Sequence, residues 1–191
     1  IYYRENMQKC AKQPPQPQTQ QVGGAGVSAS ARTTLVPAKF PKKNVDLEVY
    51  IRPGTTDEKV IDEVLKTTVY EKPKLGFYVS PGDHWLDLGG NIGTFALFAL
   101  ERGASVVTCE PESDNLEMLQ KNLLHNFSEK AGKDWHIAPV AVTTDPKDKI
   151  DLYLCKGDYN KYRHTIYHKR GRSTVAVKNM HIRDVLKKGK F

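Results

Sequence analysis

Residues 85–94 read Trp-Leu-Asp-Leu-Gly-Gly-Asn-Ile-Gly-Thr, and this stretch decides the fold of the chain. It opens with a short apolar run that predicts a buried strand and carries one acid, Asp87. Glycines follow at once, at 89, 90 and 93, and predict a tight turn. The residues after the turn have the pattern of a helix, which we expect to stop at Gly103. The stretch therefore predicts a strand, a glycine turn and a helix in direct succession.

The same pattern repeats downstream. Residues 104–111 predict a second strand, which Pro111 ends, and residues 113–126 predict an amphipathic helix opened by Ser113. Residues 135–142 predict a third strand. The alternation of strand and helix indicates parallel strands joined by right-handed crossovers, so we predict a doubly wound, mostly parallel α/β sheet. The predicted buried face of the second helix carries Leu116, Leu119, Leu123 and Leu124.

Segments on either side of this unit also have regular patterns. Residues 45–51 alternate apolar and polar side chains, as a hairpin or edge strand with one buried face does. Arg52-Pro-Gly54 ends that strand, and a helix is predicted over 57–66 with acids at its positive end. The alternating runs at 150–156 and 173–182 have no long helix between them and predict an antiparallel addition.

The amino-terminal segment differs from the rest in composition. Residues 8–31 consist largely of Gln, Pro, Gly, Ser and Ala, which bury too little apolar surface to offset the entropy of ordering. We therefore interpret residues 1–44 as a flexible, low-complexity tail and residues 45–191 as one folded domain. A proline-rich ligand for a partner domain is the alternative for the tail.

Overall composition limits the possible partners and compartments. The chain has 191 residues and a net charge of +7, which permits an anionic partner such as nucleic acid or a larger assembly, although no nucleic-acid motif is present. No apolar run approaches the roughly 20 residues that span a bilayer, so we predict no membrane span. The cysteines, Cys10, Cys109 and Cys155, form no Cys-x-x-Cys pair, which favours a reducing compartment such as the cytoplasm or an organelle interior and predicts no metal site.

The glycine turn predicts a ligand that approaches the backbone closely, because glycine has no Cβ to block it. A dinucleotide fingerprint, Gly-x-Gly-x-x-Gly, would need its first glycine at position 88, which is Leu88. The spacing is Asp-x-Gly-x-Asn-x-Gly instead. Asp87 would repel a pyrophosphate, whereas it can accept hydrogen bonds from an ammonium group or from bound water. S-adenosylmethionine carries that ammonium and no phosphate, and it is the predicted cofactor.

A second acid supports a nucleoside site. Glu110 ends the second predicted strand, 17 residues after Gly93, where its two oxygens can accept both ribose hydroxyls. Adenine needs an apolar slot, which we expect between Pro111 and the turn after the third strand, around 140–142. The predicted cofactor-binding residues are Asp87, Gly89, Gly90, Asn91, Gly93, Glu110, Pro111, Val140 and Ala141.

With these motifs the chain resembles the FkbM family of methyltransferases from about Ile51 to Leu186. The resemblance rests on Arg52-Pro-Gly-Thr-Thr-Asp57, the 87–93 loop, Glu110-Pro-Glu and the 175–186 segment. It implies a Rossmann-like, class I methyltransferase fold, of which residues 45–191 form the cofactor-binding part, and methylation of a hydroxyl oxygen on a sugar or small molecule. It also implies that Asp57 and Tyr70 belong to a cap over the cofactor.

Two departures from the family pattern stand out. Gly90 occupies a position where the family usually has alanine, and we expect this difference to be sterically harmless. Members of the family continue into a further strand and then an acidic segment. The sequence stops at Phe191, before both, so we expect the fold to be incomplete at its carboxyl end.

No residue in the sequence identifies the catalytic base. His84 and His136 lie beside or within predicted strands, which favours structural roles. An aromatic and basic cluster lies later in the chain and is either a contact surface for a phosphate, sugar or RNA, or an exposed hairpin. The competing functions are a non-catalytic methyltransferase-like subunit of an assembly and an RNA methyltransferase. The members of the cluster are Tyr159, Tyr162, Arg163, His164, Tyr167 and His168.

Overall fold

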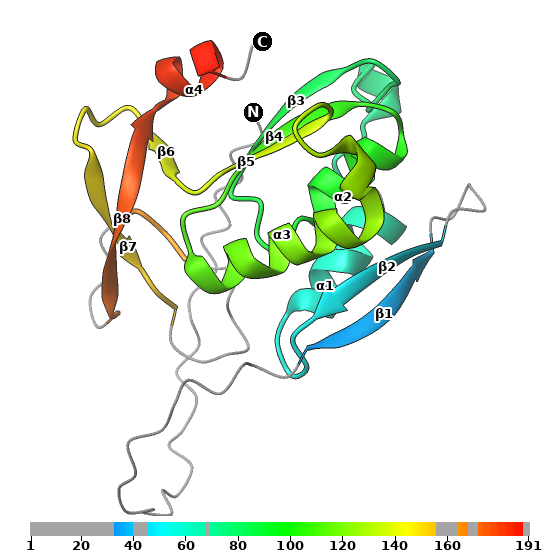
Figure 1. Cartoon of the computed structure of the whole chain (residues 1–191), viewed down its shortest axis with the longest axis horizontal. Coiled ribbons are helices and arrows are strands. Elements are labelled where there is room, and N and C mark those ends of the chain that lie inside the picture. Colours follow the sequence, from blue (N-terminus) through cyan, green and yellow to red (C-terminus); the bar gives the residue numbers. More distant parts are fainter. Residues whose placement is uncertain (1–32, 40–45, 68, 156–163, 168–171, 189–191) are drawn as a thin grey trace, which may run out of the picture. The chain divides into compact units, whose positions relative to one another are not determined.

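The computed structural model describes residues 33–39, 46–67, 69–155, 164–167 and 172–188 (Figure 1). Most of the predicted tail lies outside these residues, as do Tyr159, Tyr162, Arg163 and His168 of the aromatic and basic cluster. Among the described residues, no helix combines the length and the apolar character needed to cross a lipid bilayer.

A parallel sheet carries the glycine turn. Its strands are β3 (His84–Leu88), β4 (Ser105–Cys109) and β5 (Trp135–Ala138), in the order β3-β4-β5 (Figure 1). His84 pairs with Ser105 and Val106 pairs with Trp135, so the strands run in register from their amino ends. The predicted parallel alternation of strand and helix is thereby confirmed for this part of the chain, which is a mixed α/β fold with a small parallel sheet.

The two helices between these strands cover one face of the sheet. They are α2 (Thr94–Glu101) and α3 (Ser113–Phe127). Because consecutive strands lie in spatial order, right-handed crossovers place both helices on the same face. Val106 and Trp135 of the sheet pack there in one core with Phe98 of α2 and Leu119 of α3. The prediction for the buried face of α3 is wrong at Leu124, which is 43% exposed, and Met118 is buried instead.

The third predicted strand is split in two. β5 ends before Pro139, and β6 (Ala141–Thr143) joins a separate sheet with the order β6-β8-β7. The prediction of one strand over 135–142 is therefore wrong, because proline has no N–H with which to continue the ladder. β7 (Lys149–Tyr153) and β8 (Thr174–His181) are antiparallel, which confirms the predicted antiparallel addition.

The last helix, α4 (Ile182–Lys188), packs near the carboxyl end of the parallel sheet. Its Val185 lies in a cluster with Leu86 of β3 and Cys109 of β4. Alternate residues of a strand point to opposite faces, so Cys109 faces away from Thr108 and Val106. Val185 therefore covers part of the face opposite α2 and α3.

An antiparallel hairpin precedes the parallel sheet. β1 (Thr34–Lys39) pairs with β2 (Asp46–Ile51) over six residues, from Thr34 with Ile51 to Lys39 with Asp46. β1 falls within the predicted tail of residues 1–44, so order begins earlier than that boundary. Pro37 obscures the strand in the sequence, but β1 is an edge strand, where a missing N–H is tolerated.

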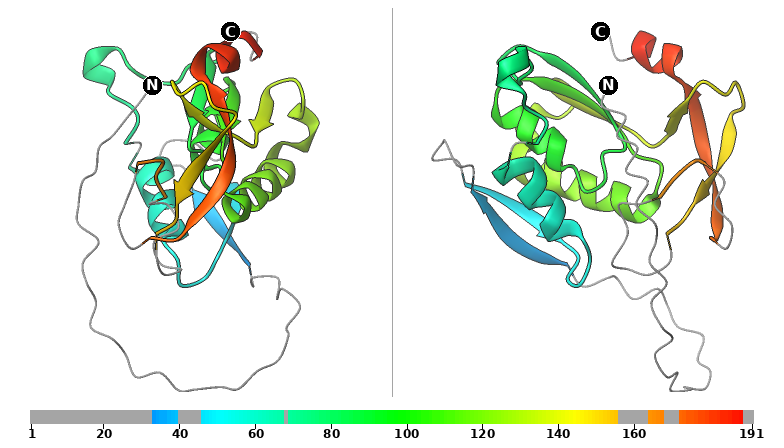
Figure 2. Two further views of the ribbon diagram at one scale, coloured as in Figure 1. Left: turned by 90° about the vertical axis from the view of Figure 1, so that its left-hand side faces the viewer. Right: turned by 180° about the vertical axis from the view of Figure 1, so that it is seen from behind.

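The hairpin packs against α3 (Figure 2), and side-chain amides join the two. Asn122 accepts from the Tyr50 amide at 2.7 Å and donates to the Tyr50 carbonyl at 3.2 Å. One turn later, Asn126 accepts from the amide of Glu48 at 3.2 Å and donates to its carbonyl at 2.8 Å. The two asparagines thus take the place of a neighbouring strand along the second edge of β2.

The predicted helix over 57–66 is present as α1 (Asp57–Ile61) continued by a π-helical turn, η1 (Asp62–Lys66). It buries Ile61, Val64 and Leu65 against the core shared with α2 and α3. Two short 3-10 turns, η2 (Pro73–Leu75) and η3 (Ser128–Lys130), complete the described elements.

Candidate functional site

The turn from β3 into α2 is folded over the end of β4. The amides of Gly89 and Gly90 both donate to the carbonyl of Cys109, at 2.8 and 3.1 Å. Gly89, Asn91 and Gly93 have positive φ angles of 83°, 52° and 88°. Glycine adopts this conformation without strain, and asparagine tolerates it better than most residues. The spacing of the motif thus matches the backbone geometry of the turn.

Gly90 is needed for a different reason, which is space. A Cβ at this position would overlap Cγ2 of Thr108 and would lie 2.7 Å from Cδ1 of Leu119. It would also lie 3.2 Å from Oδ2 of Asp87. Glycine therefore fits this position, whereas alanine would not fit without a shift of its neighbours.

Glu110 follows β4 directly and joins the glycine turn to α3. Its Oε2 accepts from the Asn91 amide at 2.8 Å, and its Oε1 accepts from the Glu112 amide at 3.0 Å. The Asn115 side chain also favours the ionised form of this carboxyl. The two amide bonds occupy about half of the roughly four acceptor positions of a carboxylate. Glu110, which is 5% exposed, thus keeps acceptor positions that these amides do not fill.

Asp87 is the second acid beneath the turn. Its Oδ2 is buried and has no hydrogen-bond partner among the described residues. Burial, and after it the negative charge of Glu110, raises the pKa of Asp87 from 3.8 to about 7. Burial likewise raises the pKa of Glu110 from 4.5 to about 7, although the hydrogen bonds from Glu112, Asn91 and Asn115 favour its ionised form. Two acids thus titrate near neutrality at the carboxyl ends of neighbouring strands.

Cys109 ends β4 and directly precedes Glu110. Burial, with the charges of Asp87 and Glu110, raises the pKa of its thiol to about 12. The thiol therefore stays protonated at neutral pH, and a protonated thiol is a poor nucleophile. Its packing in the cluster with Val140 and Val185 fits the small core residue that the sequence suggested.

The first turn of α3 completes the surroundings of Glu110. The helix is capped by Glu112, whose Oε2 accepts from the Asn115 amide at 2.8 Å. The sequence predicted Ser113 as the cap, and that prediction is wrong by one residue. A carboxylate at this place satisfies an otherwise unpaired amide and interacts favourably with the helix dipole.

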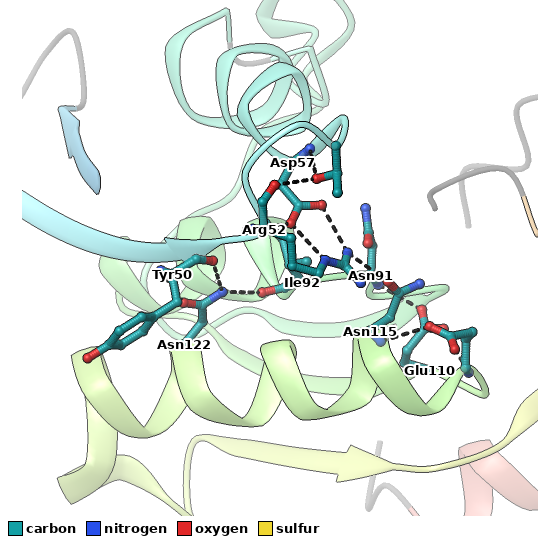
Figure 3. A network of polar contacts seen from close by, with 10 residues as sticks. Tyr50, Arg52, Asp57, Asn91, Ile92, Glu110, Asn115 and Asn122 are labelled. Atoms are coloured by element: carbon teal, nitrogen blue, oxygen red, sulfur yellow. Dashed lines mark hydrogen bonds and ion pairs between the residues drawn. The ribbon is translucent and has the colours of Figure 1, made fainter. Parts of the chain in front are cut away.

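A buried ion pair between Arg52 and Asp57 also contacts α3, through Asn115. Arg52 and Asp57 flank a turn in which the Thr55 amide donates to the Arg52 carbonyl at 3.3 Å. Pro53 and Gly54, the latter with a φ of 76°, have the residue types of a type II turn. The Arg52 guanidinium donates to both Asp57 oxygens, at 2.9 and 3.0 Å, and to Oδ1 of Asn115 at 2.9 Å (Figure 3).

Sequence reasoning did not place Arg52 or Asn115 at the site. The available signal was the five-residue spacing of Arg52 and Asp57 around Pro-Gly, which is the spacing that a tight turn brings together. Nothing in the sequence marks Asn115 as different from other polar residues of an amphipathic helix.

The remaining predicted cofactor-binding residues are Pro111, Val140 and Ala141. Pro111 is partly exposed and connects Glu110 to the cap of α3. Val140 is buried against Cys109, whereas Ala141 packs with Leu152 and Val177 of the other sheet. The structure therefore brings together Asp87, Gly89, Gly90, Asn91 and Glu110 and leaves Ala141 outside the group.

The predicted cap residues are engaged in other contacts. Asp57 is held by Arg52, and the ring of Tyr70 packs edge-on against Phe95 of α2 with a centroid distance of 5.2 Å. His84 is exposed at the amino end of β3, where its Nδ1 lies 2.7 Å from the Ser105 hydroxyl. In the described part of the chain, no three His, Cys, Asp or Glu side chains gather in a way that could hold a metal ion.

Comparison with known proteins yields one distant similarity to report. No protein-family model and no curated protein matches the chain. Among the solved structures that match is a tRNA (uracil-54, C5)-methyltransferase from Pyrococcus abyssi in complex with S-adenosyl-L-homocysteine. The two share 15% identity with a TM-score of 0.35, and the match covers 59% of this chain and 28% of that one. The chain thus spans less than a third of that enzyme, and the match identifies no function.

Proposed function

We propose that this chain binds S-adenosylmethionine at the β3–α2 turn and is the cofactor-binding part of a methyltransferase that acts on a hydroxyl of a sugar or small molecule. The proposal includes a Rossmann-like, doubly wound class I fold of the FkbM type. Its support is the motif set Asp87 to Gly93 and Glu110, which the fold gathers at one edge of a parallel sheet.

One observation carries the proposal: Glu110 is fixed to the glycine turn. In parallel sheets ligands bind outside the carboxyl ends of the strands, and an acid after the second strand commonly recognises ribose. Glu110 has this position and is oriented by the amides of Asn91 and Glu112. Its remaining acceptor positions are available to ribose hydroxyls.

The polar atoms without partners fit the rest of such a ligand. Oδ2 of Asp87 and Oδ1 of Asn91 are buried acceptors that lack a hydrogen bond among the described residues. Leaving a buried polar group unpaired costs about 1–3 kcal/mol. A ligand ammonium, directly or through water, supplies the donors that these acceptors lack, whereas a pyrophosphate would add negative charge beside Asp87 and Glu110.

The chain's own residues would bind and orient the cofactor and take no part in bond making. When bound, S-adenosylmethionine supplies an electrophilic methyl group. Glu110 holds the ribose, and Asp87 with Asn91 orients the amino-acid end. Methyl transfer depends mainly on positioning donor and acceptor in line, which is the contribution that these residues make. An acceptor hydroxyl also has to lose a proton, and we assign no residue to that step.

The test is calorimetric titration of S-adenosylmethionine and S-adenosylhomocysteine into the protein, with NAD as a dinucleotide control. We expect micromolar binding of both adenosyl ligands, no binding of NAD, and a loss of about tenfold or more in Glu110→Ala. Binding of NAD in preference, or adenosyl binding that Glu110→Ala leaves unchanged, would contradict the proposal.

A non-catalytic role in an assembly is the second candidate, and one observation favours it. Among the described residues, β3 pairs only with β4, and its Leu88 is 41% exposed beside the glycine turn. Parallel strands are usually paired and covered on both sides, so an uncovered edge suits contact with further polypeptide. Absence of any adenosyl binding, together with isolation of a stable complex, would favour this candidate. The remaining alternative, RNA methylation, is compatible with the net charge of +7 and has no motif to support it.

A further inference from the structure

The buried ion pair described above is connected to the predicted ribose acid through a single side chain. The Arg52 and Asp57 side chains are 7% and 2% exposed, and Asp57 fixes the guanidinium plane with two side-chain hydrogen bonds. The Nη2 of Arg52 then donates to Oδ1 of Asn115, which is itself buried (Figure 3). The Asn115 side chain favours the ionised form of Glu110. The backbone amide of Asn115 donates to Oε2 of Glu112, whose own amide donates to Oε1 of Glu110.

The chemistry of an amide makes this connection directional. An asparagine side chain has an acceptor oxygen on one side and a donor NH2 on the other, and the two ends are otherwise similar in shape. Because Arg52 can only donate, it holds the oxygen of Asn115 toward itself. The NH2 group then lies on the side of the amide away from Arg52, where the side chain favours the ionised form of Glu110. Without Arg52 only the carboxyl itself orients the amide, so the side chain is held less firmly.

We propose that Arg52, held by Asp57, is a positioning residue that acts through Asn115 to fix the Glu110 carboxyl for recognition of a ribose hydroxyl. The turn Arg52-Pro-Gly-Thr-Thr-Asp57 thereby sets the selectivity of the site for ribonucleosides over 2′-deoxyribonucleosides. This inference rests on the proposed function, since it assigns the sugar end of the same ligand.

A purely structural role for Asn115 makes a different prediction. In that case its removal lowers the stability of the fold and weakens all ligands alike. A matched control exists on the same helix, because Asn126 also joins α3 to β2 through its side-chain amide. Within the described part of the chain, no hydrogen bond of Asn126 involves the glycine turn or Glu110. Its removal therefore loosens the hairpin without touching the predicted ribose site.

The experiment compares two ligands, S-adenosylhomocysteine and its 2′-deoxy analogue, by calorimetric titration. The proteins are wild type, Asn115→Ala, Arg52→Lys and Asn126→Ala, each first checked for folding by circular dichroism. Because a hydrogen bond to a charged group is strong, we expect wild type to bind S-adenosylhomocysteine about tenfold or more tightly than its 2′-deoxy analogue. We expect this ratio to fall to about threefold or less in Asn115→Ala and Arg52→Lys, and to persist in Asn126→Ala.

The outcomes separate this inference from the proposed function. Tight binding of both ligands by Asn115→Ala with the wild-type ratio overturns the positioning role and leaves cofactor binding intact. An equal loss of the ratio in Asn126→Ala also overturns it, because the effect is then one of general stability. If wild type binds neither ligand, the proposed function fails and the inference fails with it. Should Arg52→Lys not fold, Asn115→Ala and Asn115→Ser decide the result.

Discussion

The backbone amide of Asn91 donates to Oε2 of Glu110 at 2.8 Å and so joins the β3–α2 turn to the end of β4. This bond couples the shape of the glycine turn to the charge of a buried acid. Because a protonated carboxyl is a weaker acceptor than a carboxylate, the protonation of Glu110 affects the turn directly. Any ligand that occupies this edge of the sheet meets both groups together.

We first predict that cofactor binding strengthens as the pH rises from 6 to 8. The pKa values of Asp87 and Glu110 are both raised to about 7, so both groups are largely protonated at pH 6. A ligand that donates hydrogen bonds binds their ionised forms and must displace those protons. Titrations at the two pH values, in buffers of different ionisation enthalpy, should show tighter binding at pH 8 and proton release near pH 6. Affinity that is constant across this range would contradict the assignment.

The same pKa values predict that Asp87→Asn stabilises the unliganded protein at high pH. A raised pKa means that the folded state holds its proton between pH 3.8 and about 7, so the stability that this proton contributes is present at low pH and lost as the pH rises through 7. The roughly three pH units, at about 1.4 kcal/mol each, set an upper limit of about 4 kcal/mol for the gain at pH 8. Denaturant unfolding should show this gain at pH 8 and little change at pH 4. Destabilisation by Asp87→Asn at pH 8 would mean that the charge of Asp87 is compensated.

Gly90→Ala should destabilise the protein by about 1–3 kcal/mol, because the new methyl group overlaps Thr108 and Leu119. Thr108→Ser removes the Cγ2 atom nearest to that methyl group, so the double variant should recover part of the loss. Gly89→Ala is the control, since its Cβ meets no atom within 4 Å and its cost comes from a φ of 83°. Thermal unfolding of these variants and of the double variant Gly89→Ala/Thr108→Ser tests this, and a Gly89→Ala defect that Thr108→Ser also relieves would contradict the steric explanation.

Removing one partner of the Arg52–Asp57 pair should lower the stability of the fold more than replacing both partners with apolar residues. Arg52→Met or Asp57→Leu alone leaves an uncompensated buried charge, for which losses of about 3–5 kcal/mol are usual. The double variant should lose less than the sum of the two single variants, and a double-mutant cycle in denaturant measures that difference. Additive losses would show that the two charges do not interact, contrary to their 2.9 Å contact.

Much of the fold could be predicted because local pattern and tertiary structure agree there. The apolar run before Gly89 and the helix after Gly93 are both where the sequence places them. The predictions were wrong where a single proline overrode the pattern of the residues around it. Pro139 divides a continuous apolar run into β5 and β6, and Pro37 hides an edge strand in the segment interpreted as tail.

The features of the candidate site that depend on backbone geometry could be predicted from the sequence. Positive φ angles at Gly89 and Gly93 and the position of Glu110 after β4 follow from motif spacing. The contacts of Arg52 and Asn115 do not, because they join residues 63 positions apart and depend on how α3 packs against β2. The pKa values of Asp87 and Glu110 depend likewise on burial that no local pattern records.

The most direct test of the central claim is to titrate ¹⁵N-labelled protein with S-adenosylhomocysteine and follow the backbone amide resonances. Asn91 is the reporter, because its amide is bonded to Glu110, and Glu48 is the control, because its amide is bonded to Asn126 on the hairpin. We expect saturable shifts of the Gly89, Asn91 and Gly93 amide resonances and no shift of Glu48. Shifts confined to other parts of the protein, or no shifts at millimolar ligand, would contradict a nucleoside site at the β3–α2 turn.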